Sequence, residues 1–282
     1  MVEWLELRVE VGESEWKVPW GNPDGPRPPA AAAALTEATT INQHRAMITL
    51  FDIGPVVIDG KETGFSPFTR RIMFAFIPTL FSNKTNDIEP TAKSVNAPPT
   101  ALKSDGVTPQ YTVPFLTDST TSKAISDSAL IAEYLDSAYP STTRISPQNT
   151  SAFANAIYAK FRALYASLGP KGKVTIMTPV LIEGMRKVHG SAVADPVVPT
   201  PEQEAAIWRS TRASFDEMYH DADLEDLGEP TYASFALAGT FWCFRSVFGR
   251  DSKEWKEVST VWAGGRIGKV LEVIEGYESM QV

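Results

Sequence analysis

The sequence predicts an α/β domain near the start of the chain, followed by a domain built only from helices. Between residues 47 and 140, short apolar runs alternate with segments of helical spacing, and prolines and glycines separate them. Beyond Tyr139, no segment shows the alternation of apolar and polar residues that is typical of a strand. Of the 282 residues, 43% are hydrophobic and 21% are charged, an ordinary globular composition with ample chain to bury a core.

Charge and residue usage exclude several classes of protein. The net charge is −8 and the pI is about 5.0, which argues against a nucleic-acid binder that relies on a basic surface. The only cysteine, Cys243, excludes an internal disulfide and a cysteine-rich metal site, and the three histidines are too scattered for a zinc motif. No apolar run approaches the roughly 20 residues that cross a bilayer. We therefore expect a cytoplasmic, metal-free protein that binds neither nucleic acid nor membranes.

Residues 1–46 differ in composition from the rest of the chain. They contain five prolines, a run of alanines, and acidic residues where a signal or transit peptide would need basic ones. We expect a flexible extension. The alternative is a short hairpin that docks elsewhere through Val9, Val11, Trp16 and Val18.

The first elements of the α/β domain follow from local patterns. Ile48–Phe51 is a short apolar run and predicts a buried strand. After a loop rich in glycine, Ser66 occupies an N-cap position and Pro67 the first position of a helix, which ends at Pro78. Residues 79–87 hold one short strand or none.

A proline marks the next strand. Residues 87–110 are mostly loop, with a helical turn near their beginning. Residues 111–118 predict a strand with Pro114 inside it. Because proline cannot donate to a strand ladder, this strand must lie at an edge or contain a special turn.

The domain closes with a hairpin and a helix. Lys123–Ile125 predicts a short strand, after which Ser126 or Asp127 caps a helix that runs to Ala138. The complete order of elements fits a thioredoxin-like α/β domain over residues 47–140.

The second domain, residues 150–282, is expected to be all-helical after a linker at 139–148. Phe153, Ile157 and Phe161 illustrate the helical spacing of its apolar residues. The predicted helices cover residues 150–168, 200–221, 231–248 and 262–277.

Three short features of the first domain have possible chemical roles. At a helix N-terminus, the Ser66 hydroxyl and the helix dipole would stabilise a bound thiolate; the alternative is plain capping. If cis, Pro114 would turn the backbone groups of Val113 outward to pair with a peptide-like ligand; the alternative is an edge-strand proline without a ligand. Residues 126–128 would bind a carboxylate at a helix N-terminus, or simply cap that helix.

The order of these features resembles the N-terminal domain of a glutathione transferase. Ser128–Ala129–Leu130–Ile131 is similar to the γ-glutamyl-binding segment of that superfamily. The closest resemblance is to the fungus-specific FuA class, which is related to bacterial β-etherases, and it spans about 235 residues beyond the first 46. The motifs that carry it are Ile48–Asp52, Ser66–Pro67, Asp87–Pro90, Ala97–Thr100, Tyr111–Pro114, Ile125–Ala129, Tyr134–Asp136, Pro230–Ala233, Asp251–Trp255 and Gly264–Arg266.

The resemblance implies a role for particular residues. Ser66 would hydrogen-bond and activate the glutathione sulfur. Val113 would hold the cysteinyl backbone, with Pro114 in the cis form. The γ-glutamyl end would be bound by Asp127 and Ser128. Lys103 is a weaker candidate for the glycyl carboxylate, because a solvated loop lysine is the better default.

Aromatic residues near the expected cleft between the domains are candidates for a hydrophobic substrate pocket, although most of them should belong to the core. They are Phe65, Phe68, Tyr158, Phe161 and Tyr165.

The implied function is that of a glutathione transferase. It would use glutathione as a co-substrate, conjugate it to a hydrophobic aromatic electrophile or cleave an activated bond with it, and serve detoxification as a homodimer without a metal. One alternative is a non-catalytic carrier of aromatic compounds. Another is a glutathione-dependent β-etherase.

The sequence departs from the family pattern at two places, and its single cysteine has an expected structural role. Between Thr69 and Asp87 the chain is a few residues short and lacks the usual Lys-Gly-Leu/Ile-Pro turn, which predicts a damaged second strand. Ser234 replaces a usual aspartate near the start of a buried helix, at a cost of about 1 kcal/mol or less. Cys243 should be a buried core thiol and not a nucleophile.

Overall fold

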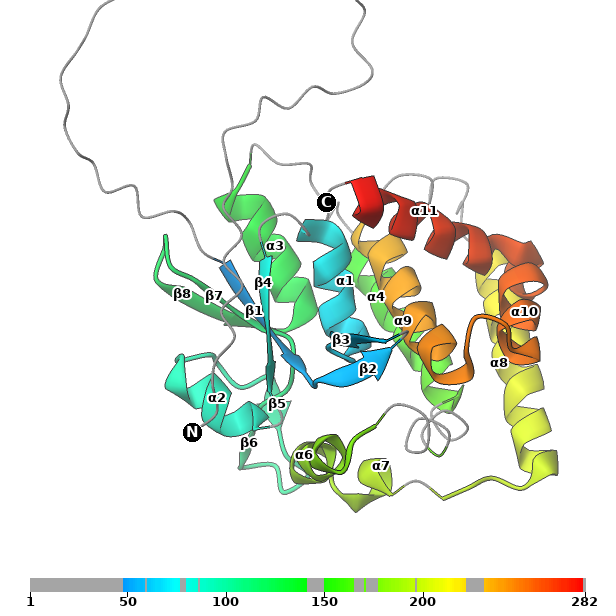
Figure 1. The fold of residues 1–282 in the computed structure, drawn as a ribbon, viewed down its shortest axis with the longest axis horizontal. Coiled ribbons are helices and arrows are strands. Elements are labelled where there is room, and N and C mark those ends of the chain that lie inside the picture. Colours follow the sequence, from blue (N-terminus) through cyan, green and yellow to red (C-terminus); the bar gives the residue numbers. More distant parts are fainter. Residues whose placement is uncertain are drawn as a thin grey trace, which may run out of the picture.

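A four-stranded mixed sheet forms the centre of the N-terminal part of the molecule (Figure 1). The structure, a computed structural model, describes residues 48–58, 60–76, 80–85, 87–140, 150–164, 170, 177–195, 197–221 and 231–280. It has a thioredoxin-like α/β domain packed against an all-helical domain, which confirms the predicted fold class. The 1–46 extension and nearly all of the predicted linker lie outside the described residues.

The strand order of the sheet is β4-β1-β7-β8. The apolar run predicted as a buried strand is β1 (Ile48–Ile53), and all of its residues except Thr49 are buried. β1 pairs in parallel with β4 (Leu80–Thr85) and antiparallel with β7 (Phe115–Asp118), which in turn pairs with β8 (Lys123–Ser126).

The sequence led us to expect a damaged second strand in the shortened region, but this strand is intact. β4 pairs with β1 along its full length, from Ile48 opposite Leu80 to Ile53 opposite Thr85. Backbone hydrogen bonds to a buried neighbouring strand do not depend on the missing turn motif, so a shorter connection preserves the ladder.

The proline predicted inside a strand lies immediately before one. β7 begins at Phe115, directly after the cis Val113–Pro114 peptide bond, and residues 111–114 are not part of the ladder. The physical reason is that Pro114 has no N–H to donate. Two small ribbons also escaped prediction, because strands of two or three residues carry too little periodicity. These are β2 (Val56–Ile58) with β3 (Lys61–Thr63), and β5 (Ala101–Leu102) with β6 (Pro109–Gln110).

Helices cover both faces of the sheet. α1 (Pro67–Phe76) and α3 (Ser128–Ala138) lie on the side that meets the helical domain, and α2 (Ile88–Ser94) lies on the other (Figure 1). Both predicted N-caps are present at α1 and α3. The Ser66 hydroxyl accepts from the backbone N–H of Thr69, and the Asp127 carboxylate accepts from that of Ala129.

The helical domain packs around α9, whose residues from Tyr232 to Arg245 are all buried. The predictions for 200–221 and 231–248 agree with α8 and α9 to within a residue. The range 262–277 divides into a 3₁₀ turn and an α-helix, and the described part of 150–168, up to residue 164, divides in the same way. Three helices, α6, α7 and α10, were not predicted. The elements of this domain are α4 (Thr150–Phe161), η1 (Arg162–Leu164), α6 (Pro179–His189), α7 (Ser191–Ala194), α8 (Pro201–Asp221), α9 (Tyr232–Phe248), α10 (Lys253–Thr260), η3 (Trp262–Gly265) and α11 (Arg266–Met280).

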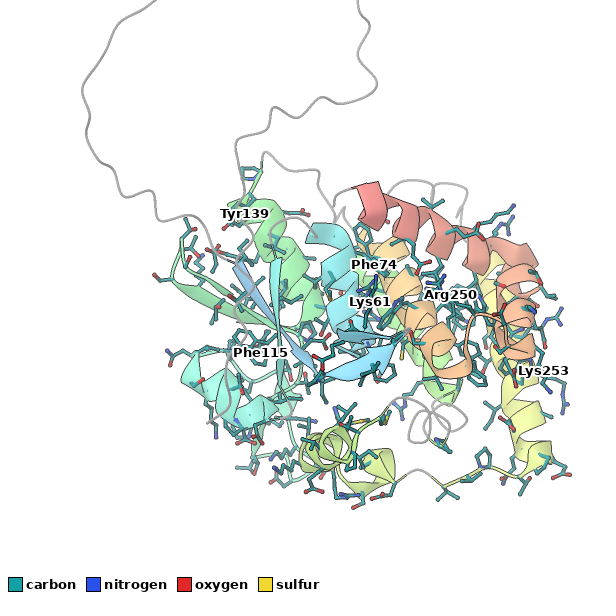
Figure 2. The ribbon with its side chains drawn as sticks, in the orientation of Figure 1. Lys61, Phe74, Phe115, Tyr139, Arg250 and Lys253 are labelled. Atoms are coloured by element: carbon teal, nitrogen blue, oxygen red, sulfur yellow. The ribbon has the colours of Figure 1, made fainter. Side chains whose placement is uncertain are left out.

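The two domains share one hydrophobic core, to which fully buried aromatic residues such as Phe74 of α1 and Phe115 of β7 contribute (Figure 2). Ser234 completes a capping box with Thr231 at the start of α9, so this helix N-terminus is capped as expected. Cys243 is buried, and burial raises the pKa of its thiol to about 12, as expected of a core thiol. None of the described helices combines the length and hydrophobicity needed to span a bilayer.

Candidate active site

The strand registers bring the sequence-predicted residues to one end of the sheet. Phe51, the last residue of β1 that pairs with β7, lies opposite Phe115, and Phe115 lies opposite Ser126. The two phenyl rings stack with centroids 4.5 Å apart. Pro114, Asp127 and the loop that leads from β1 to Ser66 therefore leave the sheet at the same end. This convergence of three separate segments defines the candidate site.

Ser66 lies at the N-terminus of α1 with its hydroxyl oriented by the helix. Its Oγ accepts a hydrogen bond from the backbone N–H of Thr69, with 3.3 Å between the heavy atoms, and the residue is 6% exposed. A hydroxyl whose oxygen accepts from the backbone can still donate its hydrogen to another atom. The positive end of the helix dipole lies at the same point. The arrangement can therefore stabilise an anion in front of Ser66.

A buried carboxyl group holds the backbone behind this serine. Asp52 Oδ1 accepts from the N–H of Ile53 at 2.7 Å and from the N–H of Ser66 at 3.1 Å. Burial raises the pKa of Asp52 to about 7, although these backbone hydrogen bonds partly offset the effect. Sequence reasoning gave Asp52 no role of its own and named it only as the last residue of the motif Ile48–Asp52. Its single signal was an acidic residue directly after an apolar run.

The N-terminus of α3 presents three polar side chains with different surroundings. Asp127 caps the helix, since Oδ1 accepts from the N–H groups of Ala129 at 2.8 Å and Leu130 at 3.3 Å. Ser128 is 4% exposed, and its Oγ accepts from the hydroxyl of Tyr232 on α9 at 2.9 Å. The Ser126 hydroxyl is buried and has no hydrogen-bond partner among the described residues.

Tyr232 is the second contact at the site that sequence reasoning missed. It lies 104 residues from Ser128, and no local pattern connects the two. Because Ser128 Oγ accepts from Tyr232, its own hydrogen remains available to donate to a ligand.

Val113 is partly buried and directly precedes Pro114 and β7, whereas Lys103 lies in the turn that joins β5 to β6. The Lys103 ammonium is 3.5 Å from the carboxylate of Glu89 on α2, and Glu89 also pairs with Lys93 at 2.8 Å. The charge of Lys103 is thus shared with a neighbouring acid.

The predicted pocket aromatics separate into exposed and buried groups. The rings of Phe68 on α1 and Tyr158 on α4 meet edge to face across the domain boundary, with centroids 4.8 Å apart, and both residues are partly exposed. Phe65 is buried. Phe161 is fully buried and packs edge to face against Phe241, so it belongs to the helical core. Tyr165 lies outside the described residues.

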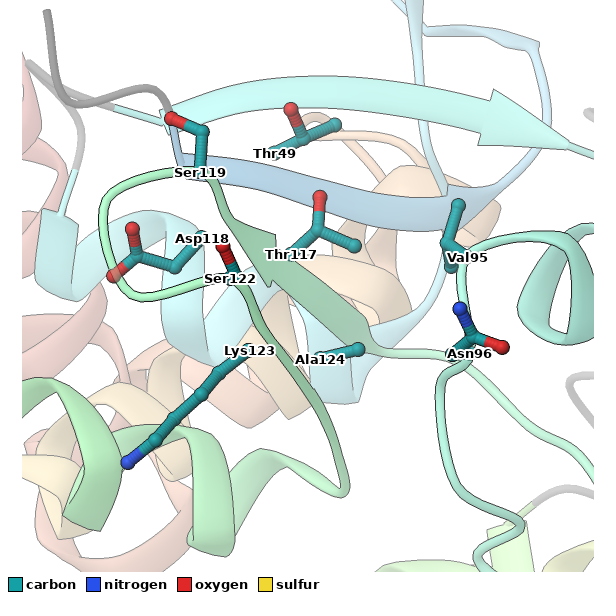
Figure 3. A pocket seen from close by; sticks show the side chains of 9 residues that line it. All are labelled: Thr49, Val95, Asn96, Thr117, Asp118, Ser119, Ser122, Lys123 and Ala124. Atoms are coloured by element: carbon teal, nitrogen blue, oxygen red, sulfur yellow. The ribbon is translucent and has the colours of Figure 1, made fainter. Parts of the chain in front are cut away.

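Two surface hollows lie away from these residues. One, of about 470 Å³, opens on the sheet face where α2 ends (Figure 3). Thr49, Thr117 and Ala124 form a row across three neighbouring strands at its base, and Val95 and Asn96 stand at its rim. The other, of about 490 Å³, lies between α2 and α6 and is lined in part by Glu89 and Lys187. Within the described residues, no group of three or more His, Cys, Asp or Glu side chains could hold a metal ion.

Comparisons with known proteins identify the class. The family profile of the glutathione S-transferase C-terminal domain matches residues 150–277, and that of the N-terminal domain matches residues 65–138. No curated protein sequence matches the chain at a significant level. The chain belongs to the glutathione transferase superfamily.

The chain is also similar to solved structures of fungal glutathione transferases, one of them named GSTFuA2. The chain is 30% identical to the glutathione S-transferase CsGST63524 of Ceriporiopsis subvermispora in complex with glutathione, with a TM-score of 0.70 and coverage of 82% of this chain and 98% of that one. The glutathione complex of CsGST83044 from the same fungus is 26% identical, with a TM-score of 0.67 and the same coverage. GSTFuA2 of Phanerochaete chrysosporium is 26% identical, with a TM-score of 0.64 and again 82% and 98% coverage.

Proposed function

We propose that this protein is an active glutathione transferase in which Ser66 activates the glutathione thiol for attack on a hydrophobic aromatic electrophile. The observation that supports this role is the Ser66 hydroxyl, placed at the N-terminus of α1 with its oxygen accepting from the N–H of Thr69. Its hydrogen is then free to donate to the thiolate sulfur, and the helix dipole favours the same charge.

The energy required is within reach of this geometry. A free thiol has a pKa of about 8.5, so little thiolate is present at neutral pH. Lowering that pKa by about 2 units needs roughly 2.7 kcal/mol of preferential stabilisation of the thiolate. A hydrogen bond to a charged group contributes about 1.5–3 kcal/mol, and a helix N-terminus about 0.3–1 kcal/mol. The thiolate then forms a thioether with the electrophilic carbon, and the leaving group departs with its electron pair.

The polar groups at the same end of the sheet suit the peptide part of glutathione. The γ-glutamyl carboxylate would be bound at the N-terminus of α3 by Ser128, with Asp127 near the amino group, and the backbone of Val113 beside Pro114 would hold the cysteinyl residue. The unpartnered hydroxyl of Ser126 supports an anion at this helix terminus. Similar proteins have been solved with glutathione bound.

The rest of the proposal concerns the aromatic substrate, the glycyl end of glutathione, the cellular location and the oligomeric state. Phe68 and Tyr158 are partly exposed at the domain boundary and would contact an aromatic ring. Lys103 would approach the glycyl carboxylate only by sharing its charge with Glu89. We further propose a cytoplasmic homodimer that acts in detoxification without a metal.

The test compares two serines that cap helices. Calorimetric titration should first show saturable glutathione binding in the micromolar to millimolar range. Conjugation of a generic aromatic halide should then disappear in Ser66→Ala. Ser252→Ala is the matched control and should retain turnover, because Ser252 caps the remote helix α10 through the N–H of Trp255.

The other functions correspond to defined outcomes. Tight binding of an aromatic dye by the parent protein, without any turnover, would favour a carrier. Release of phenol from a fluorogenic aryl ether would favour β-etherase activity. An unchanged thiolate absorbance of bound glutathione in Ser66→Ala would show that Ser66 does not activate the thiol.

A further inference from the structure

Asp52 is a buried carboxyl group that belongs to the environment of Ser66, although it is 14 residues away in sequence. It is 1% exposed and follows Phe51 in β1, at the end of the sheet where the candidate site lies. A buried carboxyl group is costly unless hydrogen bonds satisfy it. Its position therefore calls for an explanation in terms of the groups that it contacts.

Those contacts fix the segment that joins β1 of the sheet to helix α1. Asp52 Oδ1 accepts from the N–H of Ser66, and the N–H of Phe65 donates to the carbonyl of Ile53 at 3.0 Å. Gly64 packs so closely that an added Cβ would lie 1.9 Å from Asp52 Oδ2. The backbone entering α1 is thus held from two sides by the end of β1.

The charged and titratable groups around Asp52 come from two further elements. Arg70 on α1 favours the charged carboxylate, while burial opposes it and raises the pKa of Asp52 to about 7. Cys243 on α9 is close enough for the carboxylate charge to add to the effect of burial in raising its own thiol pKa. Oδ1 accepts from a backbone N–H whether the carboxyl group is charged or neutral, so the contact persists as Asp52 titrates.

We propose that Asp52 is a positioning residue, which holds the backbone of Ser66 so that the serine hydroxyl remains aligned with the glutathione sulfur. This inference rests on the proposed role of Ser66. Asp52 does not touch the substrate and acts only through Ser66. A displacement of about 1 Å at a reacting group costs on the order of 10²-fold in rate, so a backbone clamp at this residue has a measurable effect.

A second buried aspartate offers a matched control. Asp118 at the end of β7 is also 1% exposed, and its Oδ1 accepts from the N–H groups of Thr120 at 2.8 Å and Thr121 at 3.4 Å. It lies opposite Ile48, at the end of β1 farther from Ser66. Removing Asp118 should reduce stability without changing catalysis, whereas removing Asp52 should affect both.

The experiment compares Asp52→Ala, Asp52→Asn and Asp118→Ala at about pH 6, where a carboxyl group with a pKa of about 7 is mostly neutral. We expect Asp52→Ala to lower kcat/KM by about 30-fold or more. It should also raise the thiol pKa of bound glutathione, which is measured from the thiolate absorbance as a function of pH. Asp52→Asn keeps an acceptor oxygen and should remain within about 3-fold of the parent. Asp118→Ala should show the parental kcat/KM and the parental thiol pKa of bound glutathione.

Hydrogen exchange provides a readout that does not require turnover. The Ser66 amide should exchange at least about 10-fold faster in Asp52→Ala and at the parental rate in Asp52→Asn. If the parent proves inactive, the proposed function fails, but this exchange rate still decides whether Asp52 holds Ser66. If Asp52→Ala does not fold, Gly64→Ala should reproduce its effects, because the new methyl group displaces the carboxylate.

Three results would overturn the inference. Folded Asp52→Ala with parental kcat/KM and thiol pKa would reduce Asp52 to a structural role. An equal loss in Asp52→Asn and Asp52→Ala would show that the backbone acceptor is not what matters. Unchanged protection of the Ser66 amide in Asp52→Ala would show that the hydrogen bond does not hold the serine.

Discussion

Gly239 of α9 lies against the backbone of α1, and Gly239→Ala tests this close contact. An added Cβ would lie 2.7 Å from the carbonyl oxygen of Pro67 and 3.3 Å from the amide nitrogen of Arg71. Ordinary contact begins at 3.4 Å, so the two helices must separate by about 0.7 Å. Pro67 directly follows Ser66, and the displacement is therefore delivered to the candidate catalytic residue.

Two opposing effects determine the magnitude of the stability change. Overpacking a close helix contact costs about 1–3 kcal/mol, and replacing glycine by alanine inside a helix returns about 1 kcal/mol. We expect Gly239→Ala to lower the free energy of unfolding by up to about 2 kcal/mol. The same displacement at Ser66 should reduce kcat/KM by about 10-fold or more. Urea denaturation and aromatic halide conjugation measure the two effects.

Two glycines in α11 separate displacement of the site from loss of stability. Gly276 has no atom within 4 Å of an added Cβ, so Gly276→Ala should be neutral or stabilise by up to about 1 kcal/mol. Gly268 would place a Cβ 2.4 Å from the carbonyl oxygen of Ser259 on α10, a contact that does not involve α1, and Gly268→Ala should destabilise without changing kcat/KM. Parental stability and kinetics in Gly239→Ala, or an equal kinetic loss in Gly268→Ala, would refute this reasoning.

Three further predictions concern single groups. Tyr232→Phe removes the hydroxyl that donates to Ser128, and it should weaken glutathione binding by about 5- to 10-fold in calorimetry. If Tyr232→Phe weakened binding equally in a Ser128→Ala background, Tyr232 would not act through Ser128. The pKa of Asp52 is raised from 3.8 to about 7, so between these pH values the folded state binds more protons than the unfolded state. The free energy of unfolding should therefore fall as the pH rises from about 4 to 7. Urea titrations should show this fall in the parent protein and not in Asp52→Asn. Cys243, with a pKa of about 12, should resist alkylation until the protein unfolds, and rapid labelling of the native protein by iodoacetamide would contradict its assignment to the core.

Local sequence predicted the helix termini of the candidate site accurately. Ser66 caps α1 and Asp127 caps α3 through backbone N–H groups two or three residues farther along. Contacts of this kind depend on a few neighbouring residues and on backbone geometry common to all helices, so residue type alone indicates them. The prediction for α9 succeeded because the helical spacing of its apolar residues is also a local pattern.

Sequence patterns failed where the decisive contact is distant along the chain. The strand pairing of residues 80–85 depends on β1, and the absent turn motif wrongly suggested that it was damaged. Phe161 shows the same helical spacing as its neighbours, yet only the packing of α4 against α9 decides that its ring faces the core. Spacing identifies which residues share a helix face and does not identify what covers that face.

By itself, the sequence determined a thioredoxin-like domain before a helical one, a serine at the N-terminus of the first helix, and the resemblance that identifies the superfamily. Tertiary structure alone decided that Asp52 holds the backbone of Ser66 and that Tyr232 hydrogen-bonds to Ser128. The difference has a physical cause. Secondary structure and capping arise from interactions between near neighbours, which a pattern records. Burial and long-range hydrogen bonds exist only after packing has brought separate segments together.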